Sequence, residues 1–152
     1  MTPKVGLKHP YYTSPFKDFL PGTSFQRMIP ETGPASQKPK EVKKIIFCSG
    51  KVAITIDELR KEKKLEDKIA LCRIEQIYPF PYDLVLKEFC KYDKAKAVFC
   101  QEEHKNQGPW SFVRPRLENL CISRPPSAAS ATGIKWIHAK ELKDLRENIV
   151  DL

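Results

Sequence analysis

The sequence has no apolar run long enough to cross a membrane and few of the residue patterns that build metal sites. Its apolar runs, such as Ile45–Cys48, have the length of a short strand, whereas a membrane-spanning helix needs roughly 18 residues. The three histidines lie far apart, and no two cysteines have Cys-x-x-Cys spacing. We therefore expect no membrane span, no secretory signal and no metal site.

Glycine-rich phosphate loops are absent as well. The six glycines form neither the Gly-x-Gly-x-x-Gly nor the Gly-x-x-x-x-Gly-Lys-Ser/Thr pattern. Ser49-Gly50-Lys51 lies between an expected strand and an expected helix, where free backbone amides favour an anion. A tight turn followed by a solvated lysine is the simpler interpretation of these three residues.

The positive charge is spread unevenly. The 152 residues carry 27 Lys and Arg against 19 Asp and Glu, which gives a net charge of +8. Residues 1–40 hold six bases and two acids, so half of the excess lies in that quarter of the chain. A surplus as dilute as that of the remaining residues does not indicate a nucleic-acid surface. The length predicts about one domain.

The five cysteines are odd in number and lie mostly in apolar runs. This usage favours a reducing compartment. Cys48 and Cys100 each end an expected strand, and a nucleophilic thiol there would need a base, for which His104 is the nearby candidate. Buried core thiols are the favoured interpretation.

Residues 1–40 are predicted to form an extended arm. They contain seven of the thirteen prolines, which disfavour regular helix and central strand. Eight apolar or aromatic side chains in this segment need a surface to lie against: Tyr11, Tyr12, Phe16, Phe19, Leu20, Phe25, Met28 and Ile29. A transit peptide is the competing interpretation, but arginine is scarce here and proline blocks the helix that such peptides form.

Residues 41–152 alternate between strand and helix patterns. Apolar segments predict four strands, at residues 42–48, 69–77, 95–100 and 134–138. Helical spacing predicts four helices, beginning at Val52, covering 82–92, beginning at Pro109 and covering 139–152. Pro115 should kink the third helix or delay its start. The alternation predicts a three-layer αβα domain with a mainly parallel sheet, preceded by the proline-rich arm.

The segment 101–108 is the densest polar cluster and follows an expected strand at the edge where parallel sheets bind ligands. Its carboxylates and imidazole would suit acid–base chemistry if burial separated their pKa values. Interface contacts or helix capping are the more usual role of such a loop. We name four residues as a candidate interface loop: Glu102, Glu103, His104 and Asn106.

Several motifs follow one another along nearly the whole chain: Met1–Lys4 with Leu7–Pro10, Leu20–Arg27, Ile29–Glu31, Phe47–Val52, Arg73–Gln76 with Pro79–Pro81, Gln101–Gly108, Arg124–Ala129 and Ala131–Gly133. In this order they resemble the C-terminal domain of the E1 component of 2-oxoglutarate dehydrogenase, a thiamine-diphosphate family with transketolase-like architecture. The His-Lys-Asn-Gln and Arg-Pro-Pro-Ser-Ala-Ala sequences favour this enzyme over its 2-oxoadipate relative.

The resemblance implies an E1 that decarboxylates 2-oxoglutarate on thiamine diphosphate and magnesium and passes the succinyl group to a lipoyl arm of E2. It places the cofactor on other domains, so we expect this chain alone to be non-catalytic, with no catalytic, cofactor-binding or metal residue. Its implied partners are the remaining E1 domains and a second E1 subunit, in the mitochondrial matrix. A free-standing α/β enzyme and an anion-binding or nucleic-acid-binding module are the alternatives.

Some bacterial relatives in this family bind an acyl-CoA effector around this domain. Four residues lie in the matching regions and form a candidate anion site: Arg27, Ser49, Lys51 and Gln76. Tyr82 and Asp83, however, stand where those relatives carry basic residues. We therefore do not expect the effector here.

The chain departs from the family in two places. The family has a longer stretch before the Arg-Pro-Pro motif, with another strand, whereas Leu120–Ser123 leads directly into Arg124, so we expect a strand to be missing. Met1 coincides with a methionine that is internal in the family. The chain is therefore expected to be a truncated product, an excised domain or a duplicated fragment.

Overall fold

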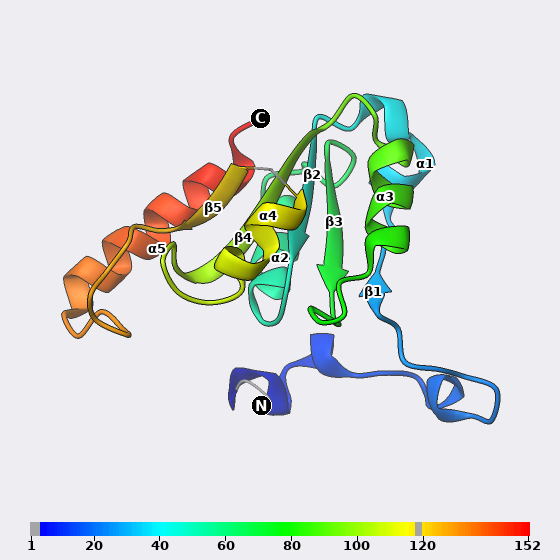
Figure 1. Cartoon of the computed structure of the whole chain (residues 1–152), viewed down its shortest axis with the longest axis horizontal. Coiled ribbons are helices and arrows are strands. Elements are labelled where there is room, and N and C mark those ends of the chain that lie inside the picture. Colours follow the sequence, from blue (N-terminus) through cyan, green and yellow to red (C-terminus); the bar gives the residue numbers. More distant parts are fainter. Residues whose placement is uncertain (1–3, 118–119) are drawn as a thin grey trace.

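The computed structural model describes residues 4–117 and 120–152 as one sheet with helices on both faces and an N-terminal segment that projects from one end (Figure 1). The strands are β1 (Met28–Ile29), β2 (Lys44–Cys48), β3 (Ile69–Ile74), β4 (Lys96–His104) and β5 (Leu120–Arg124). The α-helices are α1 (Pro34–Gln37), α2 (Val52–Glu62), α3 (Tyr82–Lys91), α4 (Trp110–Leu117) and α5 (Lys135–Val150). Short 3-10 helices are η1 (Lys4–Lys8), η2 (Pro10–Tyr12), η3 (Phe16–Phe19) and η4 (Pro39–Glu41).

The sheet is mainly parallel. Its strand order is β1-β3-β2-β4-β5, and β2 to β5 run in the same direction while β1 pairs antiparallel with β3 at one edge. All five residues of β2 are buried, as expected for a central strand that helices cover on both faces. The predicted α/β class is confirmed.

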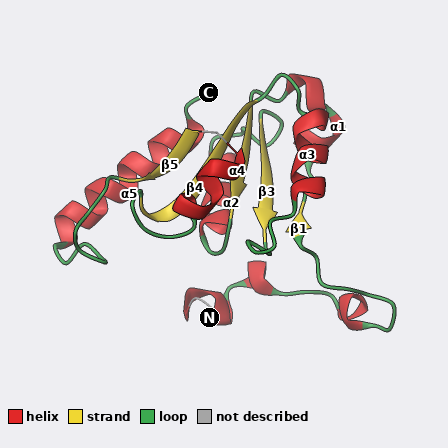
Figure 2. Cartoon of the chain, viewed as in Figure 1, coloured by secondary structure: helices red, strands yellow, loops and turns green. Residues whose placement is uncertain are grey.

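Two hydrophobic clusters separate three layers. Helices α3 and α4 pack on the face that carries Phe47 and Phe99, and helices α2 and α5 pack on the face that carries Ile46 and Val98. Neighbouring strand residues thus point to opposite faces, as strand geometry requires, and Figure 2 shows the two helical layers. Among the described residues, no helix combines the length and apolar character that crossing a bilayer requires.

One predicted element near the C-terminus is wrong, and one strand there is not predicted. Residues 134–138, predicted as a strand, contain the start of helix α5, and Ile134 and Trp136 are more than half exposed. Short apolar alternation fits one face of a strand or part of a helix equally well, and here the helix prevails. The fifth strand is β5, which lies directly before the Arg-Pro-Pro motif and was not among the predicted strands. The expectation that a family strand is missing stays a prediction.

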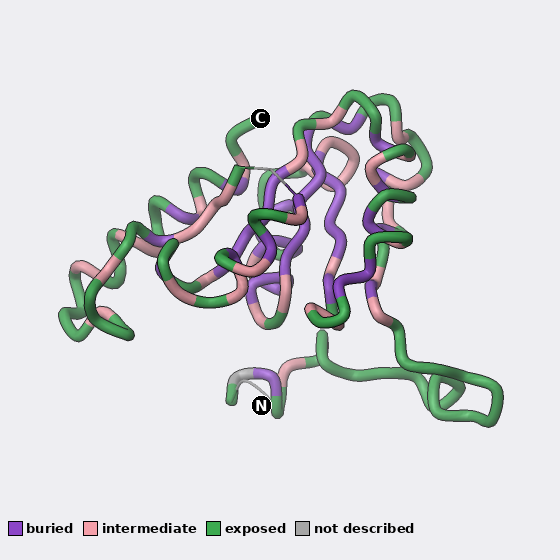
Figure 3. The backbone as a smooth tube through the Cα atoms, viewed as in Figure 1, coloured by how far each residue is buried: buried purple, intermediate pink, exposed green. Residues whose placement is uncertain are grey.

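The segment predicted as an arm is divided in the structure. Most residues before Met28 are exposed (Figure 3). Met28 is buried and pairs with Ile74 of β3, while Ala35 in α1 is fully buried in the core. The last part of residues 1–40 therefore packs into the α/β domain.

A buried ionic network holds that last part in place. We call it the Glu31–Arg60–Asp57 network, because Arg60 on α2 donates hydrogen bonds to both carboxylates, with 2.6 Å to Asp57. All three residues are more than nine-tenths buried. Arg60 also donates to the carbonyl of Ile69, and the amide of Leu71 donates to Glu31 at 2.9 Å. The network thus joins the proline-rich segment to α2 and β3.

Candidate functional site

The loops that carry the candidate residues meet at one edge of the sheet. Because β2 to β5 are parallel, their carboxyl ends share this edge, where open α/β sheets bind ligands. The chain passes from β2 to β3 on one side and later adds β4 on the other side of β2. The switch point of the topology therefore lies between the ends of β2 and β4.

An ion pair spans the switch point. The ammonium of Lys51, at the start of α2, donates to Glu102 of β4 over 2.8 Å, and about one third of each side chain is exposed. Gly50 has a φ of +73°, a left-handed conformation that glycine adopts without strain. The turn at Ser49 thus presents its lysine to a carboxylate of the same chain.

Arg27 and Gln76 lie together on another part of this edge. The amide of Gln76 donates to the carbonyl of Arg27 over 3.0 Å. The Arg27 guanidinium forms a two-pronged pair with Asp83, at 2.6 and 3.1 Å, and its hydrogen bonds lower the pKa of that carboxyl. Both cations of the candidate anion site are therefore paired with carboxylates, and anion binding there stays a prediction.

The polar segment 101–108 is not simply a loop, because its first four residues continue β4. Gln101 is 1% exposed. Its side-chain amide donates to the carbonyls of His104 and Gln107, and its carbonyl accepts from the amide of Trp110 over 2.9 Å. Gln101 thus caps α4, which starts at Trp110 without the predicted delay.

The end of this segment binds the Arg-Pro-Pro loop of the same chain. His104 Nδ1 lies 2.7 Å from the carbonyl of Pro125, and Asn106 exchanges two hydrogen bonds with the backbone of Ser127. Glu103 is exposed. Three of the four candidate interface residues therefore hold their own domain together, and their role in an interface between chains stays a prediction.

A polar pocket with a volume of about 360 Å³ opens between β4, β5 and the start of α5. We call it the β4–β5 pocket, and it is lined by Glu102, Glu103, His104, Arg124, Ser130, Ala131, Thr132 and His138. Arg124 lies opposite His104 in the strand register. Arg124 lies in a sequence motif, but neither it nor His138 had a predicted role, because their proximity depends on the fold of α5.

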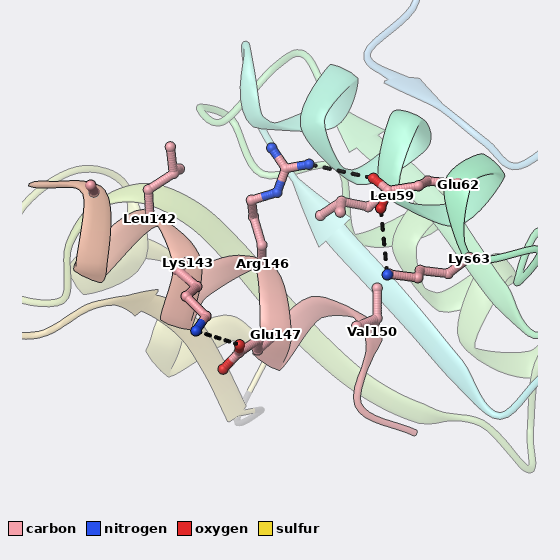
Figure 4. A pocket seen from close by; sticks show the side chains of 9 residues that line it. Leu59, Glu62, Lys63, Leu142, Lys143, Arg146, Glu147 and Val150 are labelled. Carbon is pink, nitrogen blue, oxygen red and sulfur yellow. Dashed lines mark ion pairs between the residues drawn. The ribbon is translucent and has the colours of Figure 1, made fainter.

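A second hollow of about 350 Å³ lies between α2 and α5 on the outer face (Figure 4). Its floor is apolar and includes Leu59, Leu142 and Val150. The pair Arg146–Glu62, at 3.6 Å, bridges the two helices beside it. This groove carries none of the candidate residues.

The strand thiols do not have the environment of a nucleophile. Cys48, Cys72 and Cys100 are fully buried, and burial raises the pKa of each thiol. A raised pKa removes the thiolate that nucleophilic chemistry requires. The interpretation of these cysteines as core residues is confirmed.

We predict that a maleimide labels Cys90 in the folded chain and leaves Cys48, Cys72 and Cys100 unlabelled, because only the first of these four is exposed. Half-buried Cys121 should react more slowly than Cys90. Mass spectrometry of digested samples locates the labels, with a urea-unfolded sample as the control. Rapid labelling of Cys72 in the native chain would contradict the burial of β3.

Residues 13–150 match the family model described as the 2-oxoglutarate dehydrogenase C-terminal domain. The chain belongs to this family. It is 45% identical to the mitochondrial 2-oxoglutarate dehydrogenase of Caenorhabditis elegans over 157 aligned positions, which cover 97% of this chain and 15% of that protein. It is 44% identical to the mitochondrial 2-oxoglutarate dehydrogenase-like protein of Rattus norvegicus, with 99% and 16% covered.

The chain is also similar to a relative that is named for a different substrate. The chain is 42% identical to a probable 2-oxoadipate dehydrogenase complex component E1 homolog of Dictyostelium discoideum, with 94% of this chain and 17% of that protein covered. The chain thus spans about one sixth of the length of the curated relatives it matches.

The fold extends beyond this family. A split-gene transketolase, whose structure is described as an "inactive beta4 tetramer" of subunits, has a similar fold, with a TM-score of 0.57. The two sequences are 13% identical, and the match covers 86% of this chain and 43% of that one. This likeness concerns the fold alone, and it agrees with the transketolase-like C-terminal architecture.

The residues of this 2-oxoglutarate dehydrogenase domain do not fit thiamine diphosphate and magnesium. In the described ranges, no three His, Cys, Asp or Glu side chains come together as a metal-ligand set. At the switch point, Lys51 is already paired with Glu102, and this carboxylate would repel a diphosphate.

Proposed function

We propose that the chain is the structural and dimerisation domain of a 2-oxoglutarate dehydrogenase E1. In this proposal, other domains carry out the oxidative decarboxylation of 2-oxoglutarate on thiamine diphosphate and magnesium. Those domains also transfer the succinyl group to the lipoyl arm of E2 in the tricarboxylic acid cycle. The C-terminal family match and the small share of its relatives that the chain covers support this division of labour.

The observation that carries the structural role is an exposed aromatic segment, residues 16–25, which we call the finger. Phe16, Phe19 and Phe25 are 80%, 72% and 69% exposed. Three phenylalanines within ten residues, all facing solvent, form an apolar surface of the kind that marks a protein interface. The finger therefore needs a partner surface outside this chain.

The finger is anchored to the domain at both ends. After it, Arg27 pairs with Asp83 at the start of α3. Before it, His9 lies 3.4 Å from Glu58 on α2, and burial together with the Asp57 carboxylate raises the pKa of Tyr11 to about 12. Two anchors reduce the conformational entropy that the finger would lose on docking.

The partners and location follow from the same proposal. The finger docks on the remaining E1 domains or the second E1 subunit, and the complete E1 works with E2. Relatives with about 45% identity are named mitochondrial, which supports a place in the mitochondrial matrix.

The test is complementation of an E1 that lacks this region. Mixing it with the 152-residue chain should restore the dimer in sedimentation velocity at micromolar concentration, together with 2-oxoglutarate-dependent NADH formation in the presence of E2 and E3. The triple variant Phe16→Ser, Phe19→Ser, Phe25→Ser should lose most of this effect, since it removes the apolar area.

The matched control replaces the same three phenylalanines with leucine, which keeps an apolar surface and should retain most of the complementation. Equal activity of the serine and leucine variants would refute the finger as the docking element. If the wild-type chain showed no association at all, the proposed structural role would fail.

A further inference from the structure

Lysine residues gather at the end of the sheet where the parallel strands begin. Lys44, the first residue of β2, lies level with Ile69 of β3 and Lys96 of β4. The segments that lead into these three strands therefore meet at one edge, which is at the top of Figure 1 and opposite the finger. We call this surface the lysine edge, and it consists of residues 38–44, 63–68 and 93–96.

Backbone hydrogen bonds join the three segments of the lysine edge. The amide of Lys43 donates to the carbonyl of Lys68 over 2.9 Å, and the amide of Lys96 donates to the carbonyl of Lys43 over 2.8 Å. The ammonium of Lys68 donates to Glu41 over 3.1 Å. Segments that are far apart in the sequence thus form one fixed surface.

The lysine edge carries much of the positive charge of the chain. Its three segments hold nine lysines and four acids, a surplus of five out of the net charge of +8. Lys44 is buried and donates to the last carbonyls of α5, so it is not part of the surface. Four other lysines are exposed and form no ion pair with a described carboxylate: Lys40, Lys43, Lys64 and Lys94. The fold therefore concentrates charge that is dilute along the sequence.

The composition of the lysine edge restricts its partner. It has no arginine, and Tyr92, the aromatic residue next to it, is 1% exposed. Surfaces that bind single-stranded nucleic acid stack bases on aromatic side chains, and protein interfaces are enriched in arginine and aromatic residues but depleted of lysine. Clustered lysines are flexible point charges that suit an anionic lipid surface, where each one adds to the attraction.

We propose that the lysine edge binds the phosphate headgroups of an anionic bilayer. The unpaired ammonium groups contact the headgroups. The apolar side chains of the edge, such as Val42 and Leu65, are buried or part-buried, so none is presented to the hydrocarbon. The binding is therefore electrostatic, and salt reverses it. The finger projects from the opposite end of the sheet, so this proposal does not depend on the dimerisation role.

The experiment is co-sedimentation of the full 152-residue chain with lipid vesicles. The chain should bind vesicles that contain about one third phosphatidylglycerol in phosphatidylcholine, and it should dissociate when the salt concentration is raised to about 0.5 M. Equal binding to pure phosphatidylcholine would indicate insertion of the finger and would overturn the proposal. Tighter binding to a DNA oligonucleotide at the same phosphate concentration would make the edge a nucleic-acid surface and would also overturn it.

A triple variant removes one unpaired lysine from each segment of the edge: Lys43→Gln, Lys64→Gln and Lys94→Gln. The partition coefficient onto the anionic vesicles should fall about 100-fold, since each lysine near an anionic surface contributes about fivefold. Circular dichroism confirms that the variant is folded. An unchanged partition coefficient would refute the lysine edge as the binding surface.

The matched control removes the same charge from three exposed lysines elsewhere. Lys105 follows the carboxyl end of β4, and Lys135 and Lys140 lie in the first turns of α5. Replacing these three lysines with glutamine should lower the partition coefficient less than about tenfold, because they lie away from the edge and are screened by salt. Equal losses in the two triple variants would show that net charge alone attracts the chain, and the assignment to the edge would fail.

Discussion

Replacing Arg60 with methionine should lower the free energy of unfolding by about 3–5 kcal/mol, the usual result of removing one partner from a buried ion pair. The change leaves the carboxylates of Glu31 and Asp57 buried without their shared cation. It also removes the donor to the carbonyl of Ile69. Urea denaturation followed by circular dichroism measures the loss.

Arg146→Met is the matched control, because it removes an arginine from an exposed pair with Glu62. That change should cost less than about 1 kcal/mol. Neutralising the whole network with Glu31→Gln, Asp57→Asn and Arg60→Met together should cost less than Arg60→Met alone, since no unpaired charge then remains buried. Equal losses from Arg60→Met and Arg146→Met would show that burial of the network contributes little.

The pH dependence of stability gives a second measure of the same network. Burial acts to raise the pKa of Asp57, but hydrogen bonds from Arg60 and Lys61 outweigh it and lower the pKa below its ordinary value of 3.8. A carboxyl with a lowered folded pKa contributes stability above its unfolded pKa and loses it as the pH falls through the folded value. The difference between wild type and Asp57→Asn should therefore be constant from neutral pH to about pH 5 and shrink below about pH 4.

The central part of the fold could be predicted because its strands are nearly continuous apolar runs. Segments 42–48 and 69–77 predicted strands that are present as β2 and β3, although β3 ends at Ile74. Runs of this kind indicate strands covered on both faces, and the helical segments between them require a parallel sheet. The layer order followed from these two signals alone.

The C-terminal part could not be predicted in the same way. Leu120–Arg124 forms an edge strand whose residues are mostly part-exposed, so it lacks the apolar run that identified the central strands. Residues 134–138 contain apolar side chains at alternating positions, yet they belong to a helix that is largely exposed there. Weak amphipathic signals at a sheet edge do not distinguish strand from helix.

The buried network shows a different limit. The charged run after Asp57 predicted a solvated helix face, which is correct for Lys61 but wrong for Asp57 and Arg60. Their burial depends on Glu31, which is far away in the sequence and reaches them only through β1 and the proline-rich segment. A single sequence does not reveal such long-range pairing. For the same reason, the contact between Arg124 and His138 in the candidate site was not predicted.

Gln101 was predicted to lie in a polar loop, but the structure buries it within strand β4. We predict that Gln101→Leu, which keeps the approximate volume, lowers the free energy of unfolding by about 2–4 kcal/mol. Leucine leaves the Trp110 amide and the His104 and Gln107 carbonyls without their side-chain partner. Thermal and urea denaturation measure the loss, and hydrogen exchange should show faster exchange of the Trp110 amide.

Gln107→Leu is the control for this prediction, because its side chain makes an exposed hydrogen bond to the carbonyl of Ala129, and water replaces such a bond at little cost. It should lower the stability by less than about 1 kcal/mol. Gln101→Leu should also disturb the β4–β5 pocket more than Gln107→Leu does, because the Gln101 side chain binds the backbone carbonyl of His104 in the pocket wall. If Gln101→Leu were as stable as Gln107→Leu, the loop after β4 would be held by its contacts with residues 125–129 and not by the buried glutamine.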